Sequence, residues 1–302
     1  MTRRGWLLFA AMCVIWGVPY LLIRVAVREL TPVTLVFART GLAALLLMPI
    51  AAWRGELRPL LRFWRPLLAY TAAEIVVPWW LLARAETKLS SSLTGLLIAA
   101  VPLVGALVTT FTGERERHGT RRWAGLLVGI GGVAALVGLD VQGAGALPLA
   151  ELAVVVVGYA IGPIVLARWL GGAPPLGVVA GSLGLAAVAY APFAAFSLPA
   201  TFPSWKADTS VAALAVVCTA LAFLLFFQLI AETGPVRATV ITYVNPAVAA
   251  VLGVSILGEA FTGGMAIGFA LVLAGSVLAT APGRRREPRV WRPAREGGRG
   301  SV

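Results

Sequence analysis

Ten apolar runs of about 20 residues each divide most of the chain, and they limit what it can fold into. A helix needs about 20 apolar residues to cross the roughly 30 Å of hydrocarbon in a bilayer. Strand-length segments of alternating polarity, typical of membrane barrels, are absent from the sequence. We therefore predict an all-α integral membrane protein with ten transmembrane helices. The runs cover about residues 6–27, 33–53, 64–83, 89–111, 122–140, 147–169, 175–197, 211–231, 236–257 and 263–281.

Composition agrees with this class and excludes several functions. Only 13% of residues are charged, against about a quarter in soluble domains. The single histidine, His118, and two distant cysteines offer no metal site or histidine-based catalytic triad, so we expect no cofactor and no enzyme activity. No Walker loop GxxxxGK[ST] is present, which argues against direct coupling to ATP.

The basic residues predict the orientation. The net charge of +12 could suggest nucleic acid, but most of the 25 Lys and Arg residues gather at alternate ends of the runs. The positive-inside rule then places both termini in the cytoplasm of a bacterium, with the chain in its cell membrane. We expect no nucleic-acid partner. The tail 283–302 is expected to be a disordered basic anchor, although it could also bind anionic lipid.

An internal repeat is visible when the chain is laid on itself with an offset of 144 residues. An odd number of spans per half would insert the second half upside down, and inverted repeats of this kind are typical of transporters with a midplane substrate site. We predict two five-helix halves, 1–141 and 142–282. The aligned pairs are Pro19 with Pro163, Arg24 with Arg168, Pro102 with Pro246, and Gly131 with Gly275.

Two further segments match each other and a known family. The fourth run reads LTGLLIAAVPLVGALVTTFTGE and the ninth reads RATVITYVNPAVAAVLGVSILGE, each with a proline and a closing Gly-Glu. With Trp16-Gly17 and Arg39 upstream, the chain resembles two tandem EamA-type domains of the drug/metabolite transporter superfamily. The resemblance implies ten helices, cytoplasmic termini and a central substrate cavity. Such transporters move amino acids, other metabolites and toxic compounds.

Glu74, in the stretch AAEIVVPWW, is the most unusual residue of the third run. An ionised carboxylate at this depth costs roughly 2.5–3.5 kcal/mol, so it must face water, pair with a cation or stay protonated. Pro78 cannot donate a hydrogen bond to the carbonyl of Glu74. Glu74 is therefore either a proton carrier or substrate-amine partner, or a member of a structural ion pair or hydrogen bond. Helical spacing turns Trp79 and Trp80 away from it, as packing residues.

Other polar and kink-forming residues complete the predicted site. Arg39, within the second run, could snorkel outward, pair with Glu74 or bind an anionic solute. Polar groups near proline kinks suit an organic solute, although they could equally hold helices together. The predicted substrate-binding set is Trp16, Tyr20, Tyr70, Glu74, Tyr159, Gln228, Thr242, Tyr243 and Asn245, and the predicted kinks are Pro19, Pro78, Pro102, Pro163 and Pro246.

The sequence favours a secondary transporter that moves a small organic metabolite or amphipathic drug-like solute by alternating access. Glu74 could couple it to protons, as in efflux. A solute channel is the alternative, and an intramembrane lipid-modifying enzyme is less favoured. The expected partners are the small-molecule substrate and membrane lipid, and the chain could form a homodimer. Glu114 and Glu259, which close the two Gly-Glu motifs, are interpreted as loop-capping or interface acids.

Overall fold

The computed structural model describes residues 1–111, 120–140 and 145–280, and within these ranges it contains helices and no strand. The prediction of an all-α membrane protein is confirmed. Over the same ranges, nine helical stretches are long and apolar enough to span a membrane, and Ile241–Leu257 is a shorter apolar helix. Glu114 and the tail 283–302 lie outside the described residues.

The helices follow the predicted runs, with interruptions inside several of them. The α-helices are α1 Arg3–Ile15, α2 Pro19–Ala26, α3 Pro32–Trp53, α4 Trp64–Thr71, α5 Val77–Ala85, α6 Ser91–Ile98, α7 Val101–Phe111, α8 Thr120–Asp140, α9 Ala146–Trp169, α10 Pro175–Ala195, α11 Trp205–Ala215, α12 Ala222–Thr233, α13 Pro235–Ala238, α14 Ile241–Leu257 and α15 Gly263–Thr280. A 3₁₀ turn, η1 (Arg58–Phe63), precedes α4, and two π-helical turns, η2 (Ala72–Val76) and η3 (Val216–Leu221), lie within spans.

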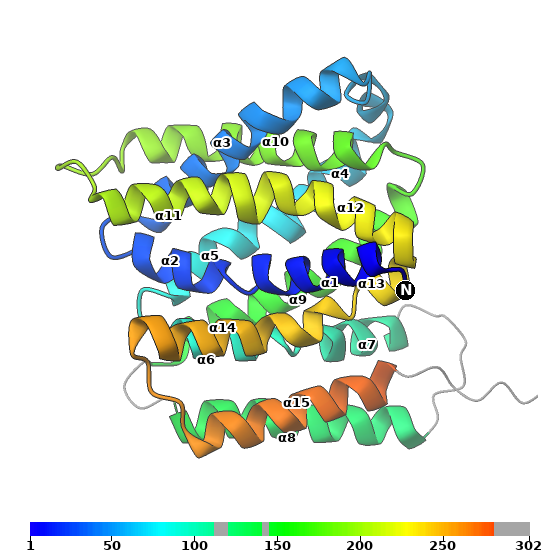
Figure 1. Cartoon of the computed structure of the whole chain (residues 1–302), viewed down its shortest axis with the longest axis vertical. Coiled ribbons are helices and arrows are strands. Elements are labelled where there is room, and N and C mark those ends of the chain that lie inside the picture. Colours follow the sequence, from blue (N-terminus) through cyan, green and yellow to red (C-terminus); the bar gives the residue numbers. More distant parts are fainter. Residues whose placement is uncertain (112–119, 141–144, 281–302) are drawn as a thin grey trace, which may run out of the picture.

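The spans run side by side, and their ends form two opposite faces (Figure 1). The N-terminus and the C-terminal end of α15 lie on the same side, which we call the amino-terminal face. The opposite side, the distal face, carries the connections at residues 27–31, 86–90, 196–204 and 258–262. Successive connections therefore alternate between the two faces, as the orientation predicted from the basic residues assumes.

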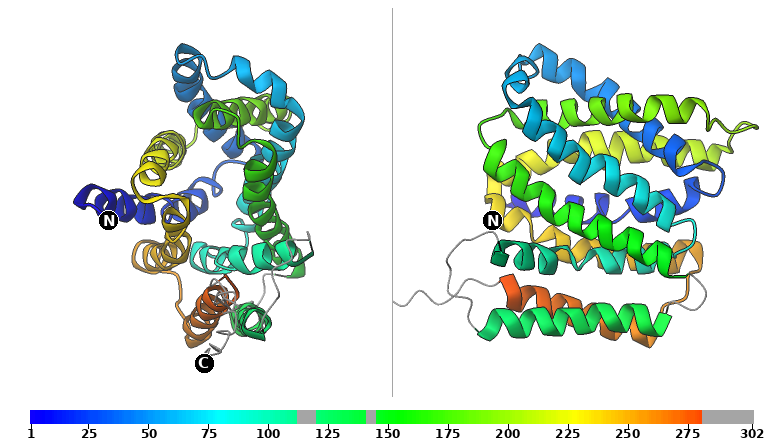
Figure 2. Two further views of the ribbon diagram at one scale, coloured as in Figure 1. Left: turned by 90° about the vertical axis from the view of Figure 1, so that its right-hand side faces the viewer. Right: turned by 180° about the vertical axis from the view of Figure 1, so that it is seen from behind.

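Contacts between spans are consistent with two inverted halves. Equivalent spans pack against each other: α3 on α10, α6 on α14, and α8 on α15. The first span (α1 and α2) packs on the eighth (α12 and α11), as the sixth (α9) packs on the third (α4 and α5). Exchanging the halves leaves this pattern unchanged, as a two-fold relation requires. Figure 2 shows the spans nearly end-on, with α8 and α15 set apart at one edge.

Glycines bring α8 and α15 together. A Cβ added at Gly125 would lie 2.5 Å from the backbone nitrogen of Ala279, and one at Gly132 would lie 2.6 Å from that of Val272. Such distances leave no room for a side chain, so the helix backbones touch directly. The close contact joins the two halves.

The prolines affect the helices differently. Pro19 begins α2 after a break at residues 16–18, and Pro102 lies in the first turn of α7 after a break at residues 99–100. Their repeat partners, Pro163 and Pro246, lie inside α9 and α14, which continue through them. In each pair, therefore, the helix is interrupted just before the proline of the first half, and it continues through the proline of the second half.

Candidate functional site

The stretch AAEIVVPWW contains a π-helical turn in the third span. At the end of η2 the backbone N–H of Val77 donates to the carbonyl of Ala72, five residues back. Pro78 has no N–H to continue this pattern, so the next carbonyl, that of Ala73, receives nothing from it. The Ala73 carbonyl faces Gly158 of α9, where a Cβ would overlap it. Single π-turns of this kind are frequent at functional sites.

Glu74 lies at the centre of η2 and points toward α9. A Cβ at Gly162 would overlap its Oε2 atom, so the carboxyl group rests against the α9 backbone. Within the described residues, Oε2 is buried and has no hydrogen-bond partner. One turn earlier, the hydroxyl of buried Thr71 is also without a partner over the same ranges. A buried acid that lacks a partner is costly, and such costs are concentrated at functional sites.

Arg39 contacts a different group of residues. Its guanidinium Nε donates to Thr219 Oγ1 in η3 at 3.0 Å, and its Cζ lies 3.7 Å from the ring centroid of Trp79. The side chain is buried, and within the described ranges it makes no ion pair. The suggested pairing with Glu74 is therefore not seen. A cation–π contact and a hydrogen bond stabilise the charge instead.

Trp79 packs in the apolar core between helices, as expected of a packing residue, but it does not lie on a surface separate from the polar groups. It is buried and lies under Arg39, among the polar groups. The expectation assumed 100° per residue from Glu74 onward, but a π-turn winds more slowly than an α-helix. Residues after η2 are thus displaced in phase. Trp80 points elsewhere and lies beside Arg84, 4.9 Å from its guanidinium carbon.

Two predicted tyrosines lie near Arg39, and one of them also lies near Glu74. Tyr159 of α9 is within electrostatic range of both, and also of Glu86. Tyr20 of α2 is buried and within electrostatic range of Tyr159 and Arg39. These contacts connect α2, α3, η2 and α9, and so both halves.

The remaining predicted residues lie apart from this cluster or on its edge. Tyr70 is buried in a separate apolar cluster with Leu60 and Leu67, although it lies within electrostatic range of Glu74. The ring of Trp16 packs on Phe226 of α12, with centroids 4.8 Å apart. Trp16 thus packs helix against helix.

The ninth and eighth spans contribute bonds between helices or within one helix. With its amide oriented to satisfy its neighbours, Asn245 donates to the carbonyls of Ile241 and Cys13 at 2.9 and 3.1 Å. Gln228 is exposed and accepts a bond from Arg4 at 3.0 Å, near the N-terminus. Thr242 Oγ1 donates to the Thr239 carbonyl, and the Tyr243 hydroxyl lies 3.2 Å from Thr280 Oγ1.

Sequence reasoning missed several residues around the site. The hydroxyl of Tyr190 in α10 donates to the Val76 carbonyl of η2 at 2.6 Å. Gly162 gave no signal because glycine is common in membrane helices. Glu86 lies in the connection between the predicted runs 64–83 and 89–111, yet its carboxyl group is fully buried. A carboxyl between basic neighbours in a short turn could have suggested this placement.

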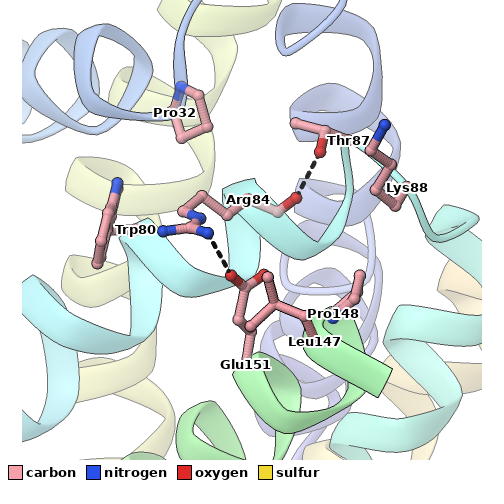
Figure 3. Close-up of a pocket in the computed structure, with 8 residues that line it drawn as sticks. All are labelled: Pro32, Trp80, Arg84, Thr87, Lys88, Leu147, Pro148 and Glu151. Carbon is pink, nitrogen blue, oxygen red and sulfur yellow. Dashed lines mark hydrogen bonds and ion pairs between the residues drawn. The ribbon is translucent and has the colours of Figure 1, made fainter. Parts of the chain in front are cut away.

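A separate pocket of about 380 Å³ opens at the distal face (Figure 3). Arg84 reaches across it to Glu151, with a nitrogen–oxygen distance of 2.9 Å. Trp80 and Lys88 line two other sides. None of the predicted substrate-binding residues lines this pocket, so it is distinct from the Glu74 cluster.

Comparisons with known proteins place these features in context. The model of the EamA-like transporter family matches twice, over residues 3–138 and 149–281. An uncharacterized inner membrane transporter of Escherichia coli strain K12, YedA, is 26% identical over 260 residues, covering 82% of this chain and 81% of that protein. YedA of strain O157:H7 matches equally. A chain of known crystal structure aligns with a TM-score of 0.67 at 21% identity, over 94% of this chain and all of that chain.

Proposed function

This chain belongs to the EamA-like transporter family, and we propose that it carries a small organic solute across the membrane by alternating access, with Glu74 as the proton-coupling residue. The observation that supports this most is the buried Glu74 oxygen, which has no partner in the described residues and lies between η2 of the first half and α9 of the second. When the halves move, an acid at their boundary meets a different environment. Its protonation can then be linked to that movement.

The neighbours of Glu74 support a binding role for the same region. Tyr159, Tyr20 and Trp79 offer aromatic surface and hydroxyl groups beside the positive charge of Arg39. An organic solute with an aromatic or apolar body and a polar group would find complementary contacts there. Because Arg39 is already bound to Thr219 and Trp79, we assign it to positioning the two halves, ahead of binding a solute.

The decisive experiment measures uptake into proteoliposomes under an imposed pH gradient. Glu74→Gln keeps the shape of the side chain but cannot exchange a proton, so its uptake under the pH gradient should fall to the level measured without a gradient. Asp208→Asn, the same change at an exposed position of α11, is the matched control and should transport normally. Normal driven uptake by Glu74→Gln would remove Glu74 from the mechanism.

Counterflow distinguishes a carrier from a channel. Vesicles loaded with unlabelled solute should accumulate labelled solute transiently if the protein is a carrier, and the exchange should persist in Glu74→Gln. Flux without exchange would indicate a channel. A thermal-shift screen against amino acids, nucleobases and cationic drugs would supply the solute.

We also propose that the amino-terminal face is cytoplasmic, as the arginine distribution predicts. Leu61 and Phe202 are exposed on opposite faces and suit cysteine labelling. An impermeant maleimide should label Phe202→Cys in intact cells and Leu61→Cys only after lysis. The reverse pattern would invert the topology.

A further inference from the structure

Glu86, at the C-terminal end of α5 on the distal face, is a second buried acid. Its side chain is fully buried, and neither carboxyl oxygen has a hydrogen-bond partner in the described parts of the chain. It has no acidic equivalent in the second half, where the repeat offset gives Ile230. An ionised carboxylate in this setting would be strongly disfavoured, because no donor in the described residues compensates for its burial.

Charged and polar groups face Glu86 from four elements. The guanidinium of Arg24 in α2 donates to the backbone carbonyl of Glu86 and leaves the carboxyl group unbound. Arg39 of α3 and the hydroxyls of Tyr20 and Tyr159 lie within electrostatic range. Glu259, beyond α14, is the fifth neighbour and has the same sign of charge as an ionised Glu86. Burial, followed by Glu259, raises the pKa of Glu86 well above its ordinary value, against the smaller opposing effects of Arg24 and Arg39.

Glu259 holds the two halves together at the same face. Gly258, with a φ of 67°, turns the chain back at the end of α14, so that Glu259 reaches the first turn of α6. Its carboxylate accepts four hydrogen bonds, from the backbone N–H and hydroxyl groups of Ser91 and Ser92, at 2.6–3.0 Å. We call this set the Glu259 latch. Glu259 thus lies between the two halves, as the interpretation of the Gly-Glu motif as an interface acid suggested.

The latch keeps Glu259 ionised. Burial alone would raise its pKa, but the four hydrogen bonds outweigh burial and lower the pKa below the ordinary value. Gly253 of α14 makes the arrangement possible, because a Cβ there would overlap Glu259 Oε2 and the Ser92 hydroxyl. With the latch closed, the distal face therefore holds ionised Glu259 beside buried Glu86, whose carboxyl group has no hydrogen-bond donor in the described residues.

We propose that Glu86 is a proton-binding site of the distal face, and that it binds its proton while the Glu259 latch is closed. The segment 86–90 joins Glu86 directly to the first turn of α6, so opening the latch would free that turn and let water reach Glu86. In the hydrated state Glu86 would release its proton. Ionisation in the closed state would instead bring two carboxylates together without water, which disfavours closure.

The way in which closure of the latch should depend on pH follows from the raised pKa of Glu86. Because the pKa of Glu86 is raised in the latched state, closure is most favoured at pH values below the pKa that Glu86 has in water. Closure is progressively lost as pH rises toward the raised pKa. This inference assumes the movement of the halves proposed above, but it does not require Glu74 to carry protons.

The test uses spin labels at Thr87→Cys and Ala260→Cys, which are exposed positions in the two halves beside the latch. The native Cys13 and Cys218 are replaced by alanine. In nanodiscs, electron paramagnetic resonance should show one short distance at pH 5 and a growing long-distance population toward pH 8. Glu86→Gln should retain the short distance throughout, and Glu259→Gln should show the long one at every pH.

Thermal unfolding is a second measurement, which can replace the distance measurement for any variant that does not take up the spin labels. The melting temperature of the unlabelled parent should fall by several degrees from pH 5 to pH 8, whereas that of Glu86→Gln should fall by clearly less, because Glu74 is the buried acid that remains. Asp208→Asn should follow the parent. A pH response in Glu86→Gln equal to that of the parent, in either measurement, would overturn the proposal. Neither measurement involves transport, so a failure of the proposed function would be seen separately.

Discussion

The two π-helical turns occupy equivalent places in the two halves, since an offset of 144 residues moves Ala72 onto Val216. They differ in chemistry. η2 carries Glu74 and meets α9 through glycines, whereas η3 carries Cys218 and Thr219 and receives Arg39 from α3. In the described residues, the acid of the first turn has no basic partner, and the arginine that reaches the second turn has no acidic partner. Because the two halves share the π-turn but not its side chains, we infer that the turn belongs to the common fold, whereas Glu74 and Arg39 act on the solute, on protons or on the contact between the halves.

Exchanging the acid between the two turns should have the largest effect. In the double variant Glu74→Cys, Cys218→Glu, the acid would lie in η3, where Arg39 is already within electrostatic range. Arg39 would hold it ionised, so it could no longer bind and release a proton. Driven uptake should stay at the background shown by Glu74→Cys alone. Recovery to the parental rate would mean that the two turns are interchangeable and that the asymmetry has no function.

Alanine at the glycines of α9 tests the contact made by the first turn. Gly158→Ala places a Cβ on the Ala73 carbonyl, which cannot move aside, and should cost about 1–3 kcal/mol of stability. Gly162→Ala meets the movable carboxyl group of Glu74 and should cost less, with most of the loss restored by adding Glu74→Ala. Gly105→Ala in α7, which meets no atom within 4 Å, is the control. Equal melting temperatures for Gly158→Ala and this control would contradict the close approach.

A change at Arg39 tests the second turn. Arg39→Lys keeps the charge but loses the planar stack on Trp79 and the Nε bond to Thr219. Because hydrogen bonds to charged groups contribute about 1.5–3 kcal/mol, thermal unfolding should show a loss of that order. Arg28→Lys, at an exposed position, should leave the melting temperature unchanged. An Arg39→Lys variant as stable as the parent would show that charge alone matters here.

The sequence was sufficient for the all-helical membrane fold because hydropathy depends on the bilayer, which imposes the same rules on every membrane helix. It also identified Glu74, since an acid in hydrocarbon always needs a reason. It could not reveal the π-turn η2, whose extra residue in one turn changed the direction in which Trp79 points and placed it against Arg39. Glu86 was missed because a charge near a span end is ordinarily solvated, and only the packing of neighbouring helices removes the water.

The smallest expected effect concerns how each turn satisfies its own carbonyls. In η2 the Val76 carbonyl is bound by Tyr190 from α10, whereas in η3 Thr219 Oγ1 donates to the Leu214 carbonyl of its own span at 2.7 Å. Tyr190→Phe removes one neutral hydrogen bond at nearly constant volume and should cost about 1 kcal/mol. Thr219→Val should cost more, because the same hydroxyl also accepts from Arg39.

Thermal unfolding of both variants, with transport measured alongside, decides how independent the two turns are. If Tyr190→Phe lowers stability slightly and leaves driven uptake unchanged, its hydroxyl serves the bend alone, and the proton-coupling role rests on Glu74. If it instead abolishes driven uptake with little loss of stability, the orientation of η2 controls the acid. Tyr190 would then be a positioning residue for which the first half has no equivalent, since the repeat offset places Leu46 opposite it.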